Sequence, residues 1–147
     1  MINQEALNLI KEFEGFKPRA YRDSVGVWTI GYGTTAMAGV GIAPKAGMVI
    51  TEAQAEEYLQ ITVDKFAADI MRRLKHPATP NQFGAMVSLA YNVGPGNFAR
   101  SSVLRRFNAN DFTGASVSFR LWNKAGGRVL AGLTRRRAAE AVLFMKP

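Results

Sequence analysis

Residues 14–33 read EGFKPRAYRDSVGVWTIGYG, and this stretch decides the fold class. Its β-branched and aromatic residues favour strands, and its glycines favour turns. We expect short twisted strands over 19–22 and 27–32, joined by a tight turn at 23–26. Residues 48–50 are a candidate third strand. The stretch therefore predicts a small antiparallel sheet rather than a flexible loop.

The segments on both sides of this stretch have helical spacing. Residues 2–13 predict a short amphipathic helix. Thr51 and Gln54 have the spacing of a capping box, which marks the start of a helix. Thr79 and Gln82 repeat that signal. Beyond the sheet, the helices are expected over 51–74, 80–93, 101–108, 111–122 and 133–145, with glycine breaks at 94–96 and 126–127.

An antiparallel sheet kept apart from the helices defines the α+β class. We expect one domain of 147 residues, which is an ordinary size for a compact domain. A small sheet lobe is expected over about 14–50 and a larger, all-helical lobe over about 51–147. The N-terminal helix is expected to pack on the helical lobe, and the helix over 51–74 to bridge the two lobes.

The composition excludes several kinds of site. The chain has no cysteine and one histidine, His76, so it cannot assemble a zinc site or use thiolate chemistry. We expect no metal and no cofactor. His76 lies where a helix should end, which favours a capping or surface role over catalysis. The net charge of +8 favours polyanionic partners, and the arginine run 135–137 is expected on a solvated helix face.

Membrane and targeting signals are not apparent in the sequence. No stretch approaches the roughly 20 continuous apolar residues of a membrane span. Residues 1–11 lack the basic and apolar regions of a secretory signal. The sequence therefore predicts a protein that is made and held in the cytoplasm.

Two carboxylates stand apart from the others, which fall on polar helix faces or near helix ends. Glu14 lies between Phe13 and Phe16, and an apolar surrounding favours the protonated form that a general acid needs. Asp23 lies in the turn beside Arg22, and a polar, cationic surrounding favours the ionised form that a base needs. Two carboxyl groups in opposite states can hydrolyse a glycoside. Many chains contain a similar pair, so the spacing alone leaves the assignment open.

A longer pattern surrounds this pair. A glutamate, eight residues, an aspartate, five residues and a threonine are matched without a gap by Glu14, Asp23 and Thr29, and Ile-Gly-Tyr-Gly follows. With the blocks over 81–94 and 102–140, this pattern resembles the phage lysozymes, or endolysins, of glycoside hydrolase family 24. The resemblance covers nearly the whole chain in order. One departure is Thr34, where many members carry histidine.

The resemblance implies a lysozyme-like fold and hydrolysis of the β-1,4 bond between N-acetylmuramic acid and N-acetylglucosamine in peptidoglycan. It implies that Glu14 protonates the glycosidic oxygen, that Asp23 activates the attacking water and that Thr29 helps to hold this water. Inversion at the anomeric carbon is implied by the resemblance, because the sequence itself does not choose between inversion and retention. The expected substrate contacts, from both lobes, are Tyr32, Thr35, Tyr91 and Asn92.

The resemblance also implies a biological setting. The enzyme is expected to be made in the host cytoplasm without a signal peptide and to reach the cell wall through a membrane pore made by another protein. Its expected partner is peptidoglycan, with no specific nucleic acid. The basic surface suggests a secondary contact with an anionic membrane or outer-membrane surface. We expect a monomer.

Three other functions stay open on the sequence. A nucleic-acid-binding module would use the charge of +8 but would leave the carboxylate pair unexplained. A lytic transglycosylase would cut the same bond without water, which would leave Asp23 and Thr29 without a role. A membrane-disrupting protein would use the basic last helix, whose apolar residues include Leu143 and Phe144.

Overall fold

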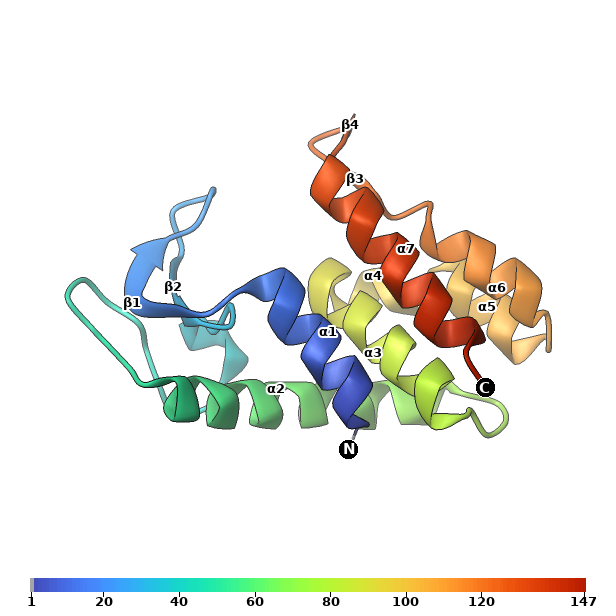
Figure 1. The fold of residues 1–147 in the computed structure, drawn as a ribbon, viewed down its shortest axis with the longest axis horizontal. Helices are drawn as coiled ribbons and strands as arrows, with labels where there is room; N and C mark the ends of the chain where they lie inside the picture. The colour runs from blue at the N-terminus through green and yellow to red at the C-terminus, as the bar shows by residue number, and fades with distance from the viewer. Residues whose placement is uncertain (1) are drawn as a thin grey trace. The chain divides into compact units, whose positions relative to one another are not determined.

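The computed structural model describes residues 2–147 and divides into two compact units. The sheet unit is residues 11–65, and the helical unit is the residues up to Ile10 together with 66–147. These boundaries fall inside two helices, α1 (Gln4–Glu14) and α2 (Glu52–Arg73), so each helix contributes to both units (Figure 1). The sheet unit therefore includes the first part of α2 as well as the glycine-rich segment.

The sheet of the sheet unit is an antiparallel hairpin of β1 (Lys17–Arg22) and β2 (Trp28–Gly31) (Figure 1). In its register Tyr21 lies opposite Thr29, and Arg22 lies opposite Trp28. The predicted strands and the turn between them are confirmed, with β1 starting two residues earlier than expected. The α+β class is confirmed with them.

The candidate third strand over 48–50 is reduced to one bridge between Arg19 and Val49. Hydrogen bonds from Ala20 N to Met48 O and from Ile50 N to Pro18 O, both 2.9 Å, flank this bridge. The pairing stops there because Thr51 begins the capping box of α2. A regular third strand was therefore a wrong prediction, although the backbone pairing itself exists.

The start of α2 covers the hairpin. The Thr51 N–H donates to the Gln54 side chain at 2.9 Å, and the Gln54 N–H donates to the Thr51 hydroxyl at 3.1 Å, which confirms the predicted capping box. Gly31 has a φ of 67°, and a Cβ there would lie 3.0 Å from the Ala55 Cβ. Glycine thus allows the end of β2 to approach the helix closely.

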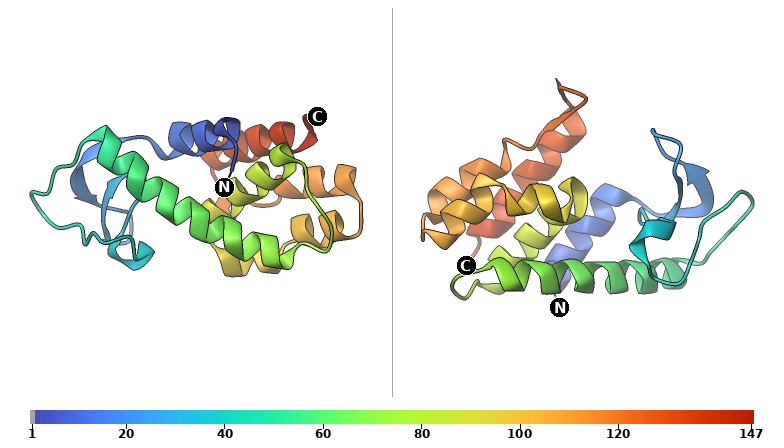
Figure 2. Two further views of the ribbon diagram at one scale, coloured as in Figure 1. Left: turned by 90° about the horizontal axis from the view of Figure 1, so that it is seen from below. Right: turned by 180° about the vertical axis from the view of Figure 1, so that it is seen from behind.

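The helical unit holds the remaining helices and a second hairpin. Their bounds are α3 (Pro80–Val93), α4 (Pro95–Ala99), α5 (Ser102–Asn108), α6 (Phe112–Phe119), α7 (Ala131–Met145), β3 (Lys124–Ala125) and β4 (Arg128–Val129). α3 packs against α7, and α6 packs against both α5 and α7 (Figure 2). The capping box predicted for α3 is confirmed at Thr79 and Gln82.

Two elements of this unit were missed. The Gly94-Pro95-Gly96 break is the junction at which α4 begins, because proline suits the first position of a helix. The Gly126-Gly127 break is the turn between β3 and β4, and both of its glycines have positive φ. Both predicted breaks are confirmed, since each glycine pair ends or separates elements. The prediction missed the elements beside them, which are α4 and the β3–β4 hairpin.

A close approach and an aromatic cluster form the core of the helical unit. A Cβ on Gly84 of α3 would lie 2.4 Å from the Ala6 Cβ of α1, so the two helices pack through a glycine contact. Phe119 and Phe144 lie with their ring centroids 5.4 Å apart, and Phe107 lies 6.3 Å from Phe144. Phe144 and Leu143 are buried, so neither contributes to an exposed apolar face of α7.

A fully buried ion cluster joins α7 to α3. Arg137 Nε lies 2.6 Å from Glu140 Oε1, Arg136 Nε lies 3.3 Å from Oε2, and the Ser88 hydroxyl donates to Oε2 at 2.6 Å. Burial raises the pKa of Glu140, and the two guanidinium groups act in the opposite direction. The solvated face expected for the arginine run is therefore correct for Arg135 alone, because Arg136 and Arg137 are needed beside a buried carboxylate.

Candidate active site

The β1–β2 hairpin sorts its side chains onto two faces. Side chains that are directly opposite in an antiparallel pair share a face, and neighbours along a strand alternate. Tyr21 and Thr29 therefore share one face, and Arg22 and Trp28 share the other. The Arg22 guanidinium lies over the Trp28 ring, 5.1 Å from its centroid.

Asp23 lies at the turn and is held by the main chain. Its N–H donates to Val27 O at 2.9 Å, so Asp23 and Val27 continue the hairpin pairing. Its Oδ1 accepts hydrogen bonds from Val25 N at 3.0 Å and Val27 N at 2.9 Å. Arg22, which was expected to provide the cationic surrounding, stacks on Trp28 instead. Two backbone N–H groups therefore orient the half-buried carboxylate, and both bind the same oxygen.

Thr29 is buried and its hydroxyl hydrogen is already used. Its side chain is 4% exposed, and Oγ1 donates to Val27 O at 3.0 Å. A hydroxyl that donates in this way keeps its lone pairs for accepting hydrogen bonds. Thr29 therefore offers an acceptor on the face it shares with Tyr21.

Glu14 is the last residue of α1 and is half-buried. Gly15 follows it with a φ of 71°, and the Gly15 N–H donates to Lys11 O at 2.9 Å, which ends the helix and starts the path into β1. Burial raises the pKa of Tyr21, and the negative charges of Glu14 and Asp23 raise it further. Both carboxylates thus lie near one phenol ring.

The structure therefore places the three predicted catalytic residues in the sheet unit, around Tyr21. Thr29 faces Tyr21 across the strands, and Glu14 and Asp23 both act electrostatically on Tyr21. Tyr21 itself was missed by the sequence analysis. Its position two residues before Asp23 is the only signal that could have indicated it, since residues two apart in a strand share a face.

Tyr32 is more buried than a substrate contact requires. It is 3% exposed, and its hydroxyl donates to Glu52 Oε1 at 3.1 Å. The Phe16 ring lies 5.7 Å away and Lys11 Nζ lies 5.6 Å from the Tyr32 centroid. Burial raises the pKa of Tyr32, as does its hydrogen bond to Glu52. Little of this ring is left for a sugar, whereas the half-buried Thr35 lies just before a short 3-10 helix, Ala36–Ala38.

Thr34, the departure from the family pattern noted in the sequence, lies inside the sheet unit. It is 2% exposed, and its N–H and C=O both pair with Ile30 at 2.9 Å. Among residues 2–147 the Thr34 hydroxyl has no hydrogen-bond partner. A buried hydroxyl without a partner is destabilising, so this position is not optimised for stability.

The other two predicted substrate contacts belong to the helical unit. Tyr91 is half-buried, with its ring 5.6 Å from that of Phe66. Asn92 is exposed and lines an open pocket of about 370 Å³ together with Trp122 and Lys124. Trp122 is half-buried and forms part of this pocket wall.

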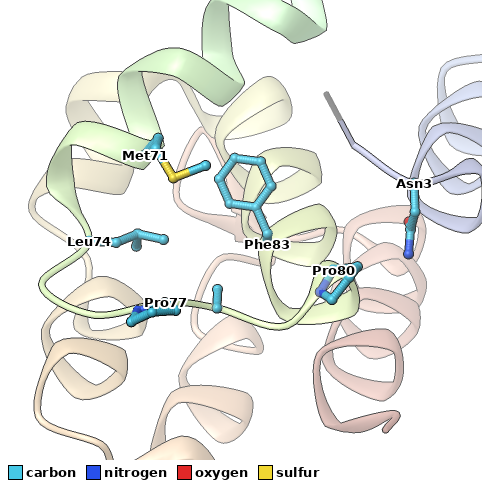
Figure 3. Close-up of a pocket in the computed structure, with 7 residues that line it drawn as sticks. Asn3, Met71, Leu74, Pro77, Pro80 and Phe83 are labelled. Atoms are coloured by element: carbon cyan, nitrogen blue, oxygen red, sulfur yellow. The ribbon is translucent and has the colours of Figure 1, made fainter.

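A second pocket of the helical unit, about 290 Å³, has no titratable side chain in its lining (Figure 3). Met71, Leu74 and Phe83 point toward one another in it, and the lining contains no charged side chain. A general acid or base needs a titratable group within reach of the substrate. The catalytic candidates therefore remain those on the hairpin and at the end of α1.

His76 has a structural role, as predicted. Its Nε2 lies 2.7 Å from Phe107 O, its Nδ1 lies 3.1 Å from Pro77 O, and its ring stacks on Phe107 at 4.3 Å. It follows the end of α2 and joins that connection to α5. Within residues 2–147, no three potential metal ligands gather in one place, and no helix has the length and apolar character needed to cross a bilayer.

The fold is that of a lysozyme-like protein, and the comparisons agree. Residues 11–140 match the Phage lysozyme family. The endolysin of Bacillus phage PZA is 43% identical over 145 residues, which cover 97% of this chain and 54% of that protein. The endolysin of Acyrthosiphon pisum secondary endosymbiont phage 1 is 40% identical over 147 residues, covering 97% of each. A variant of the lysozyme of phage P22 superposes with a TM-score of 0.88 at 35% identity, covering 99% of each chain.

The chain belongs to the phage lysozyme family, whose members are the glycoside hydrolases that phages use as endolysins. It spans about half the length of the first of these relatives, and nearly the full length of the second. The family segment contains Glu14, Asp23 and Thr29, so the candidate catalytic residues lie inside the matched region.

Proposed function

We propose that this chain hydrolyses the β-1,4 bond between N-acetylmuramic acid and N-acetylglucosamine in peptidoglycan and thereby lyses the host cell. The observation that carries the proposal is the arrangement around the hairpin. Backbone N–H groups orient the Asp23 carboxylate, Thr29 lies on the same strand pair, and Glu14 ends the helix that leads into it. This supplies an acid, a base and a water-holding hydroxyl in one unit.

The proposed reaction uses only Glu14, Asp23 and one water molecule. The Glu14 carboxyl gives its proton to the glycosidic oxygen as the bond from that oxygen to the anomeric carbon breaks. A water attacks the anomeric carbon from the opposite side and gives a proton to Asp23 Oδ2. Both backbone hydrogen bonds bind Oδ1, so Oδ2 is the oxygen available for this proton. Attack from the opposite side inverts the configuration, which is our proposal for the stereochemistry.

We assign the substrate contacts according to how exposed each candidate residue is. Asn92 is exposed at a pocket, and its amide can pair with an acetamido group of the glycan. Thr35 and Tyr91 are half-buried and keep some accessible surface. Tyr32 is buried and hydrogen-bonded to Glu52, so it has little surface left for contact with a sugar.

The setting of the reaction is part of the proposal. We propose that the enzyme is made in the host cytoplasm, acts as a monomer and reaches the wall through a membrane pore. The net charge of +8 supports a contact with anionic surfaces of the wall or membrane. Binding to purified sacculi that does not weaken with added salt would contradict this electrostatic contact.

The test compares the natural protein with Glu14→Gln on outer-membrane-permeabilised Gram-negative cells. Glu12→Gln is the matched control, because Glu12 is an exposed residue two positions away on the same helix. We expect the Glu14 variant to lose several orders of magnitude in clearing rate and the control to keep its rate. Equal clearing by all three proteins would reject the glycosidase. Products with reducing ends support hydrolysis, whereas 1,6-anhydro ends would make the enzyme a transglycosylase.

A further inference from the structure

The attacking water needs more partners than Asp23 and Thr29 provide. A water molecule has two hydrogens to donate and two lone pairs. One hydrogen goes to Asp23, and the second fits Thr29 Oγ1, which accepts because its own hydrogen is used on Val27 O. One lone pair attacks the anomeric carbon. The other lone pair is left without a donor.

Tyr21 lies where that donor is needed. It is opposite Thr29 in the strand register, and Cβ atoms of such a pair lie about 4.5–5.5 Å apart. Asp23 follows two residues later, just past the end of β1, and its charge acts on Tyr21. The Tyr21 side chain is half-buried, and its hydroxyl makes no hydrogen bond to any residue within 2–147. The Tyr21 hydroxyl therefore has no hydrogen-bond partner among the described residues, and it lies near Asp23 and Thr29, the two residues proposed to bind the water.

We propose that Tyr21 is a positioning residue of the hydrolysis, whose hydroxyl donates a hydrogen bond to the attacking water while Asp23 and Thr29 accept from it. The inference rests on the proposed function, since it assigns a further residue to that same site. Three fixed partners leave the water one free lone pair, and that lone pair points at the anomeric carbon. Tyr21 exchanges no proton in this step, because the water gives its proton to Asp23.

The electrostatics of the site agree with a donor role. Burial and the charges of Glu14 and Asp23 all raise the pKa of Tyr21, which keeps the phenol protonated at neutral pH. A neighbouring phenol can also donate without competing with Asp23 for the proton of the water. Tyr21 is therefore in the protonated form that a donor needs.

The experiment measures kcat and KM separately on soluble peptidoglycan fragments for the natural protein and Tyr21→Phe. Phenylalanine keeps the ring and removes only the hydroxyl. We expect kcat to fall about 10- to 100-fold with KM within about twofold, because the substrate still binds while the water is less well placed. The melting temperature should not fall, since the hydroxyl has no partner in the protein.

Tyr58→Phe is the matched control. Tyr58 is a half-buried residue of α2 in the same unit, and its hydroxyl also lacks a hydrogen bond within residues 2–147. Its kcat and KM should equal those of the natural protein. A Tyr21→Phe variant that matches this control would overturn the inference.

A double-mutant cycle with Thr29→Val sharpens the result. If both hydroxyls hold one water, adding Tyr21→Phe to Thr29→Val should cost much less than it costs alone. Losses in kcat that multiply, a rise in KM alone, or a lowered melting temperature with loss of activity would each overturn the inference. Glu14→Gln is measured alongside. If Glu14→Gln stays active, the proposed function fails, whereas an inactive Glu14→Gln beside a fully active Tyr21→Phe rejects only the role of Tyr21.

Discussion

The sheet unit and the helical unit use their polar groups in opposite ways. In the sheet unit the Asp23 carboxylate is oriented by backbone N–H groups and stays half-exposed. In the helical unit Glu140 is fully buried and its oxygens are taken up by Arg137, Arg136 and Ser88. One carboxylate stays accessible to solvent, and the other holds the packing of α7. The position of a carboxylate in this fold therefore tells whether its loss should affect activity or stability.

The glycines show the same contrast. All seven glycines of the sheet unit, from Gly15 to Gly47, have positive φ, so the main chain of this unit depends on turns that other residues adopt with strain. The helical unit also uses glycine inside a helix, at Gly84, where the reason is the close approach of Ala6. The sheet unit thus gains shape from backbone conformation, and the helical unit gains it from side-chain packing.

The largest expected effect comes from breaking the ion cluster with Glu140→Ala. Removing the carboxylate takes a buried charge partner away from two buried guanidinium groups, which should cost about 3–5 kcal/mol of unfolding free energy. Urea unfolding checks this value. Arg135→Ala is the control on the same helix, because Arg135 is exposed and should change stability by less than about 0.5 kcal/mol. Equal losses of unfolding free energy in the two variants would show that the buried cluster stabilises the protein no more than an exposed arginine does.

A smaller effect is expected at the Asp23 turn. Gly26 has a φ of 86°, so Gly26→Ala should cost about 1–2 kcal/mol and disturb the N–H groups that orient Asp23. The clearing rate should therefore fall more than the stability suggests. The paired change Gly96→Ala lies in α4 at an open position, where alanine should be neutral or slightly stabilising. A turn variant with a full clearing rate would argue against backbone orientation of Asp23.

The smallest effect is expected at alkaline pH from Tyr32. Burial raises its pKa above the ordinary value, so the neutral phenol favours the folded state. That stability is fully present below about pH 10 and is lost as pH rises through the raised pKa of the folded protein. The melting temperature of the natural protein should therefore fall more steeply above pH 10 than that of Tyr32→Phe. Parallel curves for the two proteins would contradict the assignment.

Local signals in the sequence predicted local structure well. The capping boxes at Thr51 and Thr79 are present because each depends on residues only three apart. The hairpin and the residues of the predicted catalytic site follow from a short continuous pattern. These features need no knowledge of distant contacts.

Features that depend on distant contacts were not predictable in the same way. The burial of Arg136 and Arg137 requires Ser88 and Glu140, and α3 is about 50 residues away from α7 in the chain. The proposed role of Tyr21 requires the strand register, because only the pairing with Thr29 places both residues on one face of the hairpin. Composition alone suggested a solvated arginine face and gave no reason to select one tyrosine.

The contact between Ala6 and Gly84 bears on the order in which parts of the chain can fold during synthesis. A chain emerges from the ribosome N-terminus first, and domains generally fold as units. Asn3 pairs with Asn81, 78 residues later, and Glu5 pairs with Lys146, 141 residues later. Among the described residues, the first ones made are thus among the last to find their partners. The sheet unit is contiguous and can form while residues 2–10 still wait for α3 and α7.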